Sequence, residues 1–250
     1  MKFLRARKGG EAFYAALENG RIRRLAGSPY EGAVYTGDEY APGEVTLLPP
    51  CEPTKIVAVG LNYAKHAAEM KEKLSGNPIL FLKPTTALIA HGGTIIWPEA
   101  SQRVDYEAEL AVVISRTCKN VSPEEAPAYI FGYTALNDVT ARDVQKADGQ
   151  WTRAKSYDTF CPVGPVIETD YDPAGRRVQS VLDGEVKQDG NTNDMLFKPA
   201  ELVSYISGCM TLLPGDIVAT GTPEGIGPMR SGGVVEIRVE GLDILRNSVE

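Results

Sequence analysis

Short apolar runs bounded by proline, glycine and polar residues recur along the chain, a pattern typical of β-strands. Strands are predicted at KIVAVGLN, ILFLKP, TIIWP, DIVATG and VVEIRVEG, which are residues 55–62, 79–84, 94–98, 216–221 and 234–241. The dipeptides Asn19-Gly20 and Asp183-Gly184 accept the positive φ of tight turns, so each predicts a β-hairpin. The pattern therefore indicates a mostly β chain.

Helical patterns are fewer. Helices are predicted over residues 63–74 with Asn62 as N-cap, over residues 123–135 with Ser122 as N-cap, and over residues 198–210. The stiff segment PPCEP separates the N-terminal hairpin from everything that follows. The chain is accordingly predicted to be an α+β protein with a small N-terminal β unit, residues 1–47, and a larger domain, residues 48–250.

The segment VDYEAELAVVIS, residues 104–115, is predicted to be one strand with an acidic face. Side chains alternate along a strand, so Asp105, Glu107 and Glu109 lie on the same face. Ala111 and Val113 continue that face into a buried region. The Cβ atoms of the two glutamates would lie about 6.6 Å apart, twice the rise per residue. Two such carboxylates repel each other unless a positive charge or a shared proton lies between them.

Composition limits what can supply this positive charge. The 250 residues are 43% hydrophobic, which is enough for a sizeable core, and the net charge is −7. No cluster of Lys and Arg follows the basic N-terminal segment, so nucleic acid and membrane surfaces are not expected as partners. The four cysteines lie far apart, and no secretory or membrane-spanning segment is recognisable, so a cytoplasmic location is expected. Small molecules and metal ions remain as expected partners.

A third carboxylate completes a candidate metal site. Asp138 lies at the end of another β-like segment, and with Glu107 and Glu109 it forms a ligand set made only of oxygen. Such a set suits Mg²⁺ or Mn²⁺, whereas zinc prefers His or Cys. A solvated sheet edge is the alternative explanation for a Glu-x-Glu pair, and the apolar residues that continue the same face count against it.

A histidine and a glutamate form a candidate proton-transfer pair. His66 and Glu69 lie three residues apart on one face of a predicted helix, where the carboxylate can orient the imidazole and raise its basicity. A surface pair without function is the alternative. The glycine-rich TGTPEGIGP, residues 220–228, lets backbone amides approach an anion, but it is neither a Walker loop nor a dinucleotide motif, and a plain turn explains it equally well.

Six ordered blocks between about residues 55 and 240 resemble the fumarylacetoacetate hydrolase family. They are GLNYAKHAAEM, ILFLKP, VDYEAELAVVI, FGYTALNDVTARD, KSYDTFCPVGP and GDIVATGTPEGIGPM. The resemblance implies a mixed β-sandwich or β-roll, usually a homodimer, that binds Mg²⁺ or Mn²⁺ through Glu107, Glu109 and Asp138. It thus implies that a divalent ion is the positive charge beside the acidic strand, with Asp105 as a rim residue or a partner of the ligands.

The same resemblance implies roles for other residues. The family acts on 2-oxo acids and their enols by C–C hydrolysis, decarboxylation or isomerisation. Its proton-shuttling or water-activating pair matches His66 and Glu69, and a lysine near the developing oxyanion matches Lys155. The substrate contacts that it implies are Thr222, which matches a substrate-facing threonine, and Lys83 and Arg142, for which structural ion pairing is the alternative.

Within the family, the sequence most resembles enzymes of homoprotocatechuate (aromatic) catabolism that isomerise 2-hydroxyhepta-2,4-diene-1,7-dioate or decarboxylate its precursor, 5-oxopent-3-ene-1,2,5-tricarboxylate. Acylpyruvate hydrolases and oxaloacetate decarboxylases are the alternative, and a non-catalytic metal-binding member of the fold is a further one. A dioate has a second carboxylate, which needs a cation or several N–H donors when it is buried. Candidate cations are Lys65, Lys71, Lys73, Lys146, Arg153 and Lys155.

Overall fold

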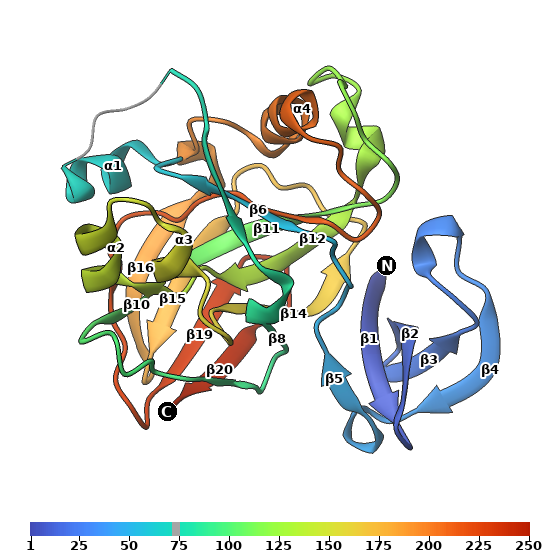
Figure 1. Ribbon diagram of the computed structural model, residues 1–250. Coiled ribbons are helices and arrows are strands. Elements are labelled where there is room, and N and C mark those ends of the chain that lie inside the picture. The colour runs from blue at the N-terminus through green and yellow to red at the C-terminus, as the bar shows by residue number, and fades with distance from the viewer. Residues whose placement is uncertain (72–75) are drawn as a thin grey trace.

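The computed structural model describes residues 1–71 and 76–250, and strands dominate it (Figure 1). In this part of the chain, the largest sheet has the strand order β4 (Tyr35–Tyr40), β3 (Arg21–Leu25), β2 (Glu11–Glu18), β1 (Lys2–Lys8), β14 (Cys161–Glu168), β12 (Ile130–Asn137), β11 (Ala108–Ile114), β17 (Ile217–Ala219), β6 (Ile56–Gly60) and β7 (Ile79–Lys83). Two further strands join it at its sides, β5 (Thr46–Leu48) beside β1 and β8 (Leu88–Ile89) beside β14.

Two smaller sheets complete the β structure of the described residues. One contains β16 (Glu185–Asn191), β15 (Arg177–Leu182), β19 (Val234–Val239), β20 (Leu245–Val249) and β9 (Thr94–Ile95). The other contains β13 (Thr140–Ala141), β10 (Val104–Tyr106) and β18 (Gly227–Pro228). Most neighbours are antiparallel, but β6 and β17 run parallel. The prediction of a mostly β, mixed architecture is confirmed.

Strand β11 lies in the middle of the core and is buried on both faces. Leu110 and Val112 belong to the large apolar cluster that also contains Ile237 of β19, so this face packs between two sheets. Ala111 and Val113 belong to a second cluster on the opposite face. The predicted alternation of faces is therefore found, and the acidic residues at the start of this strand enter a region from which water is excluded.

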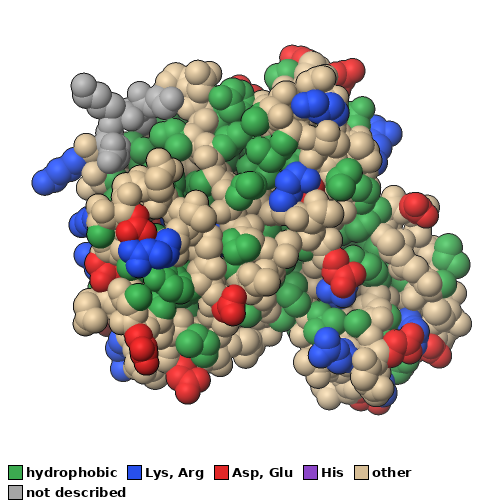
Figure 2. Space-filling model, in the orientation of Figure 1, with side chains coloured by type: hydrophobic (Ala, Val, Ile, Leu, Met, Phe, Trp, Pro, Cys, Tyr) green, Lys and Arg blue, Asp and Glu red, His purple; other side chains and the backbone are tan. Residues whose placement is uncertain are grey.

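Four helices are present in the described part of the chain. They are α1 (Ala64–Met70), α2 (Arg142–Asp148), α3 (Thr152–Lys155) and α4 (Pro199–Cys209). Single 3₁₀ turns occur at Pro29–Glu31, Pro42–Glu44, Thr85–Ala87, Ala126–Tyr129 and Thr192–Asp194. None of the described helices is both long and apolar enough to span a bilayer. On the face shown in Figure 2, acidic and basic side chains are intermixed and do not form one large patch of either sign.

Both predicted hairpins are confirmed. The turn between β2 and β3 has φ values of 49° at Asn19 and 75° at Gly20, and the turn between β15 and β16 has 51° at Asp183 and 87° at Gly184. Two consecutive residues with positive φ give a turn whose twist matches that of the flanking strands. The turn residues therefore set the pairing of these strands locally.

The helix predicted over residues 123–135 is wrong. Ser122 and Glu125 do exchange the hydrogen bonds of a helix start, with the N–H of Ser122 donating to the glutamate and the N–H of Glu125 donating to the serine hydroxyl. Only the 3₁₀ turn Ala126–Tyr129 follows, and the chain then enters β12. Pro127 interrupts the helical hydrogen bonds. The β-branched and aromatic residues after it gain more from pairing with β11 than from a helix.

The helix predicted over residues 63–74 begins as expected but has a different cap. Tyr63 is the N-cap and makes no side-chain capping bond. The side chain of Asn62 instead donates to the carbonyls of Phe197 and Thr220 and accepts from the N–H of Phe197. It therefore ties the start of α1 to two distant segments. Helix α1 ends at Met70, and residues 72–74 of the prediction lie outside the described residues.

The N-terminal strands stand at one side of the molecule (Figure 1). Their small core contains Leu4, Phe13 and Ile22, and Val166 of β14 packs into it. Strand β1 pairs with both β5 and β14, so backbone hydrogen bonds connect this unit to the larger sheet. We keep the division at residue 47 as a proposal.

Candidate metal centre

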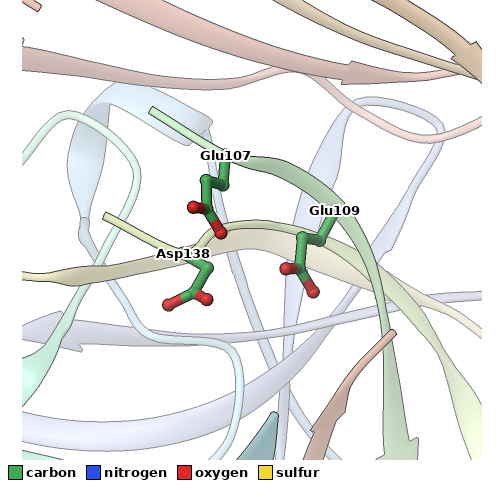
Figure 3. A group of neighbouring side chains, drawn as sticks. All are labelled: Glu107, Glu109 and Asp138. Carbon is green, nitrogen blue, oxygen red and sulfur yellow. The ribbon is translucent and has the colours of Figure 1, made fainter. Parts of the chain in front are cut away.

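Glu107, Glu109 and Asp138 meet where two neighbouring strands pair (Figure 3). Glu109 lies on β11, Glu107 directly precedes that strand, and Asp138 directly follows β12. The two strands are antiparallel, and the N–H of Asp138 donates to the carbonyl of Glu107 over 2.9 Å. One carboxylate oxygen from each residue lies within 4.8 Å of the other two, and all three side chains are buried. The carboxylates turn toward one shared space.

The single strand predicted over residues 104–115 is interrupted at Glu107. The N–H of Glu107 donates to the side-chain oxygen of Asn137, and the N–H of Ala108 donates to that of Gln188, each over 2.9 Å. Because side chains satisfy these two amides, the backbone leaves the ladder of β10 and enters that of β11 without losing buried hydrogen bonds. The interruption therefore lies at one of the candidate ligands.

Buried cations surround the three carboxylates. The Nζ atom of Lys155, at the end of α3, lies 2.7 Å from Glu107 and 2.6 Å from Asp138. The Nζ atom of Lys83, on β7, lies 2.6 Å from the other oxygen of Asp138. Arg142, the first residue of α2, donates to Glu107. The acidic face is thus held by three positive side chains from elements that lie far apart in the sequence.

Of the two places that we considered for Asp105, the structure agrees with a partner of the candidate ligands. The side chain is fully buried, so the rim is wrong. Its two oxygens accept hydrogen bonds from Arg103 and Arg142, each over 2.8 Å. Since Arg142 also contacts Glu107, the aspartate holds the guanidinium against that candidate ligand.

The surroundings shift the pKa values of the two glutamates in opposite directions. Burial alone would raise the pKa of Glu107, but the charges of Lys155 and Arg142 outweigh it and hold this pKa well below its usual range. Burial, together with the negative charges of Asp138 and Glu107, raises the pKa of Glu109 well above its usual range. Among the described residues, Glu109 forms no ion pair, and it accepts a 2.7 Å hydrogen bond from the N–H of Gly221. Glu109 is therefore the carboxylate that most lacks a cation.

His66 and Glu69 form the predicted pair on α1. The Nδ1 atom of His66 lies 3.1 Å from a carboxylate oxygen of Glu69. The same carboxylate accepts a 3.1 Å hydrogen bond from the N–H of Gly225, in the glycine-rich loop. The imidazole is buried and the carboxylate is partly exposed. Glu69 thus fixes the ring, and the loop in turn fixes Glu69.

A cavity of about 280 Å³ joins these groups. Its walls comprise Val59, Gly60, Leu61, His66, Met70, Phe81, Glu107, Glu109, Asp138, Arg142, Gln145, Lys146, Gly149, Trp151, Lys155 and Thr222. The volume is near the lower end for small-molecule sites, so the cavity suits a small organic acid. The structure therefore brings the candidate metal ligands and His66 to one enclosed space.

All three predicted substrate contacts are engaged by the protein itself, and Arg142 donates to Asp105, Glu107 and Gln145. Lys83 is not part of the cavity wall, because its ammonium is held by Asp138 and by the carbonyl of Val139. Thr222 lines the cavity, but its hydroxyl donates to the carbonyl of Ala108 and accepts from the side chain of Gln188. Structural ion pairing explains Lys83, and Thr222 can offer a substrate only its remaining lone pair.

Sequence reasoning missed an aromatic wall of the cavity. The rings of Phe81 and Trp151 meet edge to face, with centroids 5.3 Å apart. Trp151 reaches this position because Gly60 has no side chain, since a Cβ atom there would lie 2.3 Å from the indole ring. Gln145, which accepts from Arg142, was also missed, although its i+3 position relative to Arg142 on α2 could have indicated it.

The comparison with protein families agrees with this geometry. The family described as fumarylacetoacetate (FAA) hydrolase C-terminal matches residues 55–250, and the one described as Rv2993c-like, N-terminal matches residues 1–50. The chain belongs to the fumarylacetoacetate hydrolase family. The predicted resemblance is confirmed, together with the fold class that it implied.

Proteins from distant organisms resemble this chain over most of its length. An uncharacterised protein of Methanocaldococcus jannaschii is 53% identical over 208 residues, which cover 83% of this chain and 88% of that protein. A mitochondrial oxaloacetate tautomerase of Rattus norvegicus is 39% identical over 218 residues, which cover 82% of this chain and 70% of that protein. The crystal structure of a 2-hydroxyhepta-2,4-diene-1,7-dioate isomerase from Mycobacterium marinum is 42% identical with a TM-score of 0.93, and 100% of this chain and 98% of that chain are covered.

The residues of this family member fit a divalent cation. Glu107, Glu109 and Asp138 offer hard oxygen donors from three sides of one buried space, which is the chemistry that Mg²⁺ and Mn²⁺ prefer. Glu109 has no paired cation among the described residues, and a divalent ion would supply the positive charge that favours its ionised form. The other two carboxylates would share the ion with Lys155, which already contacts both.

Proposed function

We propose that this chain is a Mg²⁺- or Mn²⁺-dependent enzyme that isomerises or decarboxylates 2-oxo and 2-hydroxydienoic dicarboxylic acids. The most specific candidate substrate is 2-hydroxyhepta-2,4-diene-1,7-dioate. One observation carries the proposal: three carboxylates suited to a metal ion and the histidine of a His–Glu pair face the same small cavity. The likeness to a structure that bears this isomerase's name supports the choice of substrate.

The proposed chemistry depends on stabilising an enolate and moving one proton. A divalent ion held by the three carboxylates would supply an electrophile for the carboxylate and adjacent C2 oxygen of the substrate. His66 faces the cavity while its Nδ1 atom is bonded to Glu69, which leaves Nε2 to take or give the proton. Because the carboxylate of Glu69 is itself held by Gly225, the ring keeps one orientation during the transfer.

Lys155 and Arg142 act beside this proton transfer. Both are buried cations on the cavity wall, and each contacts a candidate ligand. Burial lowers the pKa of Lys155, but Asp138 and Glu107 outweigh it and raise this pKa above its usual value, so the side chain stays an ammonium. A fixed positive charge at this place stabilises negative charge that develops on the substrate oxygen. Thr222 contacts the substrate through the remaining lone pair of its hydroxyl oxygen and so helps to position it.

Other reactions of the same enolate are the second candidate function. Acylpyruvate hydrolysis and oxaloacetate decarboxylation would use the same carboxylates and the same His66–Glu69 pair. The rat relative is named an oxaloacetate tautomerase, and keto–enol exchange needs only the proton-transfer part of this machinery. A metal-binding member of the fold without catalysis is a third candidate, and the complete set of site residues argues against it.

A substrate panel with added Mg²⁺ or Mn²⁺ tests the proposal. The heptadienedioate is expected to have a kcat/KM higher than acetylpyruvate and oxaloacetate by roughly 30–150-fold, because a paired terminal carboxylate contributes about 2–3 kcal/mol. If acetylpyruvate or oxaloacetate is better by about tenfold, the second candidate function is correct. Turnover of none of the three would favour the non-catalytic member.

We also propose that the chain forms a homodimer, as the family resemblance implies. Light scattering coupled to size-exclusion chromatography measures the mass directly. A dimer gives about twice the 27.0 kDa of the chain, and a monomer at working concentration contradicts this proposal without affecting the proposed chemistry.

A further inference from the structure

One cation on the cavity wall has no partner in the described part of the chain. The Lys and Arg residues of this wall are Arg142, Lys146 and Lys155. Arg142 is bonded to Asp105, Glu107 and Gln145. Lys155 is held between two candidate metal ligands. Lys146 is exposed, and its ammonium forms neither an ion pair nor a hydrogen bond with any described residue, so it is free to bind a ligand.

The other cations that could bind a distant carboxylate are less suitable. Lys65 lies 3.4 Å from Glu224, and Arg153 makes two hydrogen bonds to Asp148. Neither Lys65 nor Arg153 lines the cavity, and Lys71 does not line it either. Lys73 lies outside the described residues. Of the described candidates, only Lys146 combines a place on the cavity wall with an uncommitted charge.

Helix α2 sets the distance between Lys146 and the metal centre. Arg142 is the first residue of this helix and contacts Glu107, whereas Lys146 lies in the last turn. Residues four apart lie on the same helix face, about 6 Å along the axis. Both side chains therefore reach the cavity, and the second does so one helical turn farther from the candidate ligands.

The wall of this cavity also contains apolar side chains. Phe81 and Trp151 pack edge to face, and the indole lies against the backbone of Gly60. Leu61 and Met70 add further apolar surface. Such a wall suits a planar conjugated carbon chain, because apolar contact and ring stacking stabilise it without demanding hydrogen bonds.

From this arrangement we infer that Lys146 is the specificity-determining residue of the cavity and pairs with the second carboxylate of the substrate. The inference rests on the proposed function, because it places the first carboxylate at the metal centre. The favoured class is an extended dicarboxylate whose two acid groups are separated by several carbon atoms. An acid with one carboxylate leaves Lys146 in water and gains nothing from it.

The test compares two substrates that differ only at the far end. In the presence of Mg²⁺, kcat/KM is measured for 2-hydroxyhepta-2,4-diene-1,7-dioate and for 2-hydroxyhexa-2,4-dienoate, which lacks the second carboxylate. Lys146→Met is expected to lower the ratio of the two values by about tenfold or more, the effect of losing a charge-assisted hydrogen bond. Lys146→Arg should keep most of the ratio, and Lys146→Glu should lower it further through repulsion.

A matched control separates this effect from a change in net charge. Lys119→Met removes the same charge from a surface position, where the ammonium donates to the carbonyl of Gly208, and it should leave the ratio as it is. A wild-type ratio near one overturns the inference. So does an unchanged ratio in Lys146→Met.

A binding measurement distinguishes failure of this inference from failure of the proposed function. Calorimetry in the presence of Mg²⁺ gives the affinities for 2-oxoheptanedioate and 2-oxohexanoate without requiring turnover. If the wild-type protein prefers the dioate and Lys146→Met loses that preference, the role of Lys146 stands even if no substrate is converted. If the wild-type protein and Lys146→Met each bind 2-oxoheptanedioate no more tightly than 2-oxohexanoate, the inference is wrong, whatever reaction the enzyme catalyses.

Discussion

The metal centre and the N-terminal unit both hold basic side chains against carboxylates, but water reaches only one of these regions freely. At the metal centre, Lys155 bridges Glu107 and Asp138, and all three side chains are buried. In the N-terminal unit, Arg24 pairs with the exposed Glu11. Charges in the buried group have no alternative partner, whereas the exposed carboxylate of Glu11 can exchange its arginine for water.

Aromatic rings lie beside basic side chains in both regions, since the ammonium of Lys155 lies 5.3 Å from the ring centroid of Phe81. The guanidinium of Arg24 lies over Phe13 with 4.9 Å to the ring centroid, and that of Arg23 lies over Tyr35 with 4.3 Å. Each pair is local and can be lost alone. At the metal centre one carboxylate serves two cations, since Asp138 accepts from both Lys83 and Lys155. The comparison suggests that a buried charge cluster responds to change as a unit and exposed pairs respond individually.

The largest expected effect comes from removing the ion or one of its ligands. EDTA is expected to abolish turnover, and Glu109→Gln to lower kcat/KM by about 1000-fold or more, because the stabilisation of the enolate is lost. The melting temperature should fall only modestly, since a core of this size stands without the ion. Activity and melting curves of metal-free and reconstituted protein measure both. Full activity in exhaustively metal-free protein would refute the proposed function.

The next effect concerns the histidine pair beside the ligands. His66→Ala and Glu69→Gln should each lower kcat by on the order of 100-fold, the usual size of a general acid–base contribution. The double variant should lose little more, because the two side chains act as one unit. Mg²⁺ affinity measured by calorimetry should barely change. If His66→Ala loses metal binding instead, the histidine is a ligand and the division of roles is wrong.

A third prediction compares the two regions by stability. Lys155→Met should destabilise the metal-free protein by about 3–5 kcal/mol, because Glu107 and Asp138 are left buried with less positive charge. Added Mg²⁺ should recover part of the loss. The control Arg24→Met should lower the urea midpoint much less, since its partner Glu11 is exposed and solvent replaces the arginine there. Equal losses in the two variants would show that the distinction between buried and exposed charges does not hold here.

A smaller effect is expected from pH. The raised pKa of Glu109 means that the folded, metal-free protein binds this proton more tightly than the unfolded chain does. The stability that this proton confers is present at low pH and is lost as pH rises from the usual glutamate pKa through the raised one. Metal binding must displace the proton, so Mg²⁺ affinity should weaken as pH falls through the raised pKa. Titrations in buffers of different ionisation enthalpy measure the protons released, and an affinity independent of pH would contradict the prediction.

Two of the candidate metal ligands and the histidine pair were predictable because short-range spacing encodes them. Glu107 and Glu109 follow from strand alternation, and His66 and Glu69 from helix geometry. Asp138 was placed at the end of a β-like segment, although the strand that ends there, β12, begins at Ile130 inside the predicted helix. Both hairpins were predictable for the same reason, since two residues determine each turn.

Features that depend on distant partners were not predictable. The interruption of the strand at Glu107 depends on two side chains from other strands. Asn137 accepts a hydrogen bond from the N–H of Glu107, and Gln188 accepts one from the N–H of Ala108. The helix expected after Ser122 was replaced by a strand because β11 offers it a pairing edge. Likewise, nothing near Gly60 in the sequence indicates that Trp151 will cover it. Local patterns identified the candidate site residues, whereas tertiary contacts determine their pKa values and the residues that line the cavity around them.

The count of charges at the metal centre has a consequence for what the cavity can hold. Its fully buried carboxylates are Asp105, Glu107, Glu109 and Asp138, and its buried cations are Lys83, Arg142 and Lys155. With every group ionised, this set carries one net negative charge, and a divalent ion changes it to one net positive charge. The first carboxylate of a substrate then brings the interior to neutrality. A second carboxylate must find its counter-charge outside this set, and Lys146 stands at the cavity wall with that charge unclaimed among the described residues.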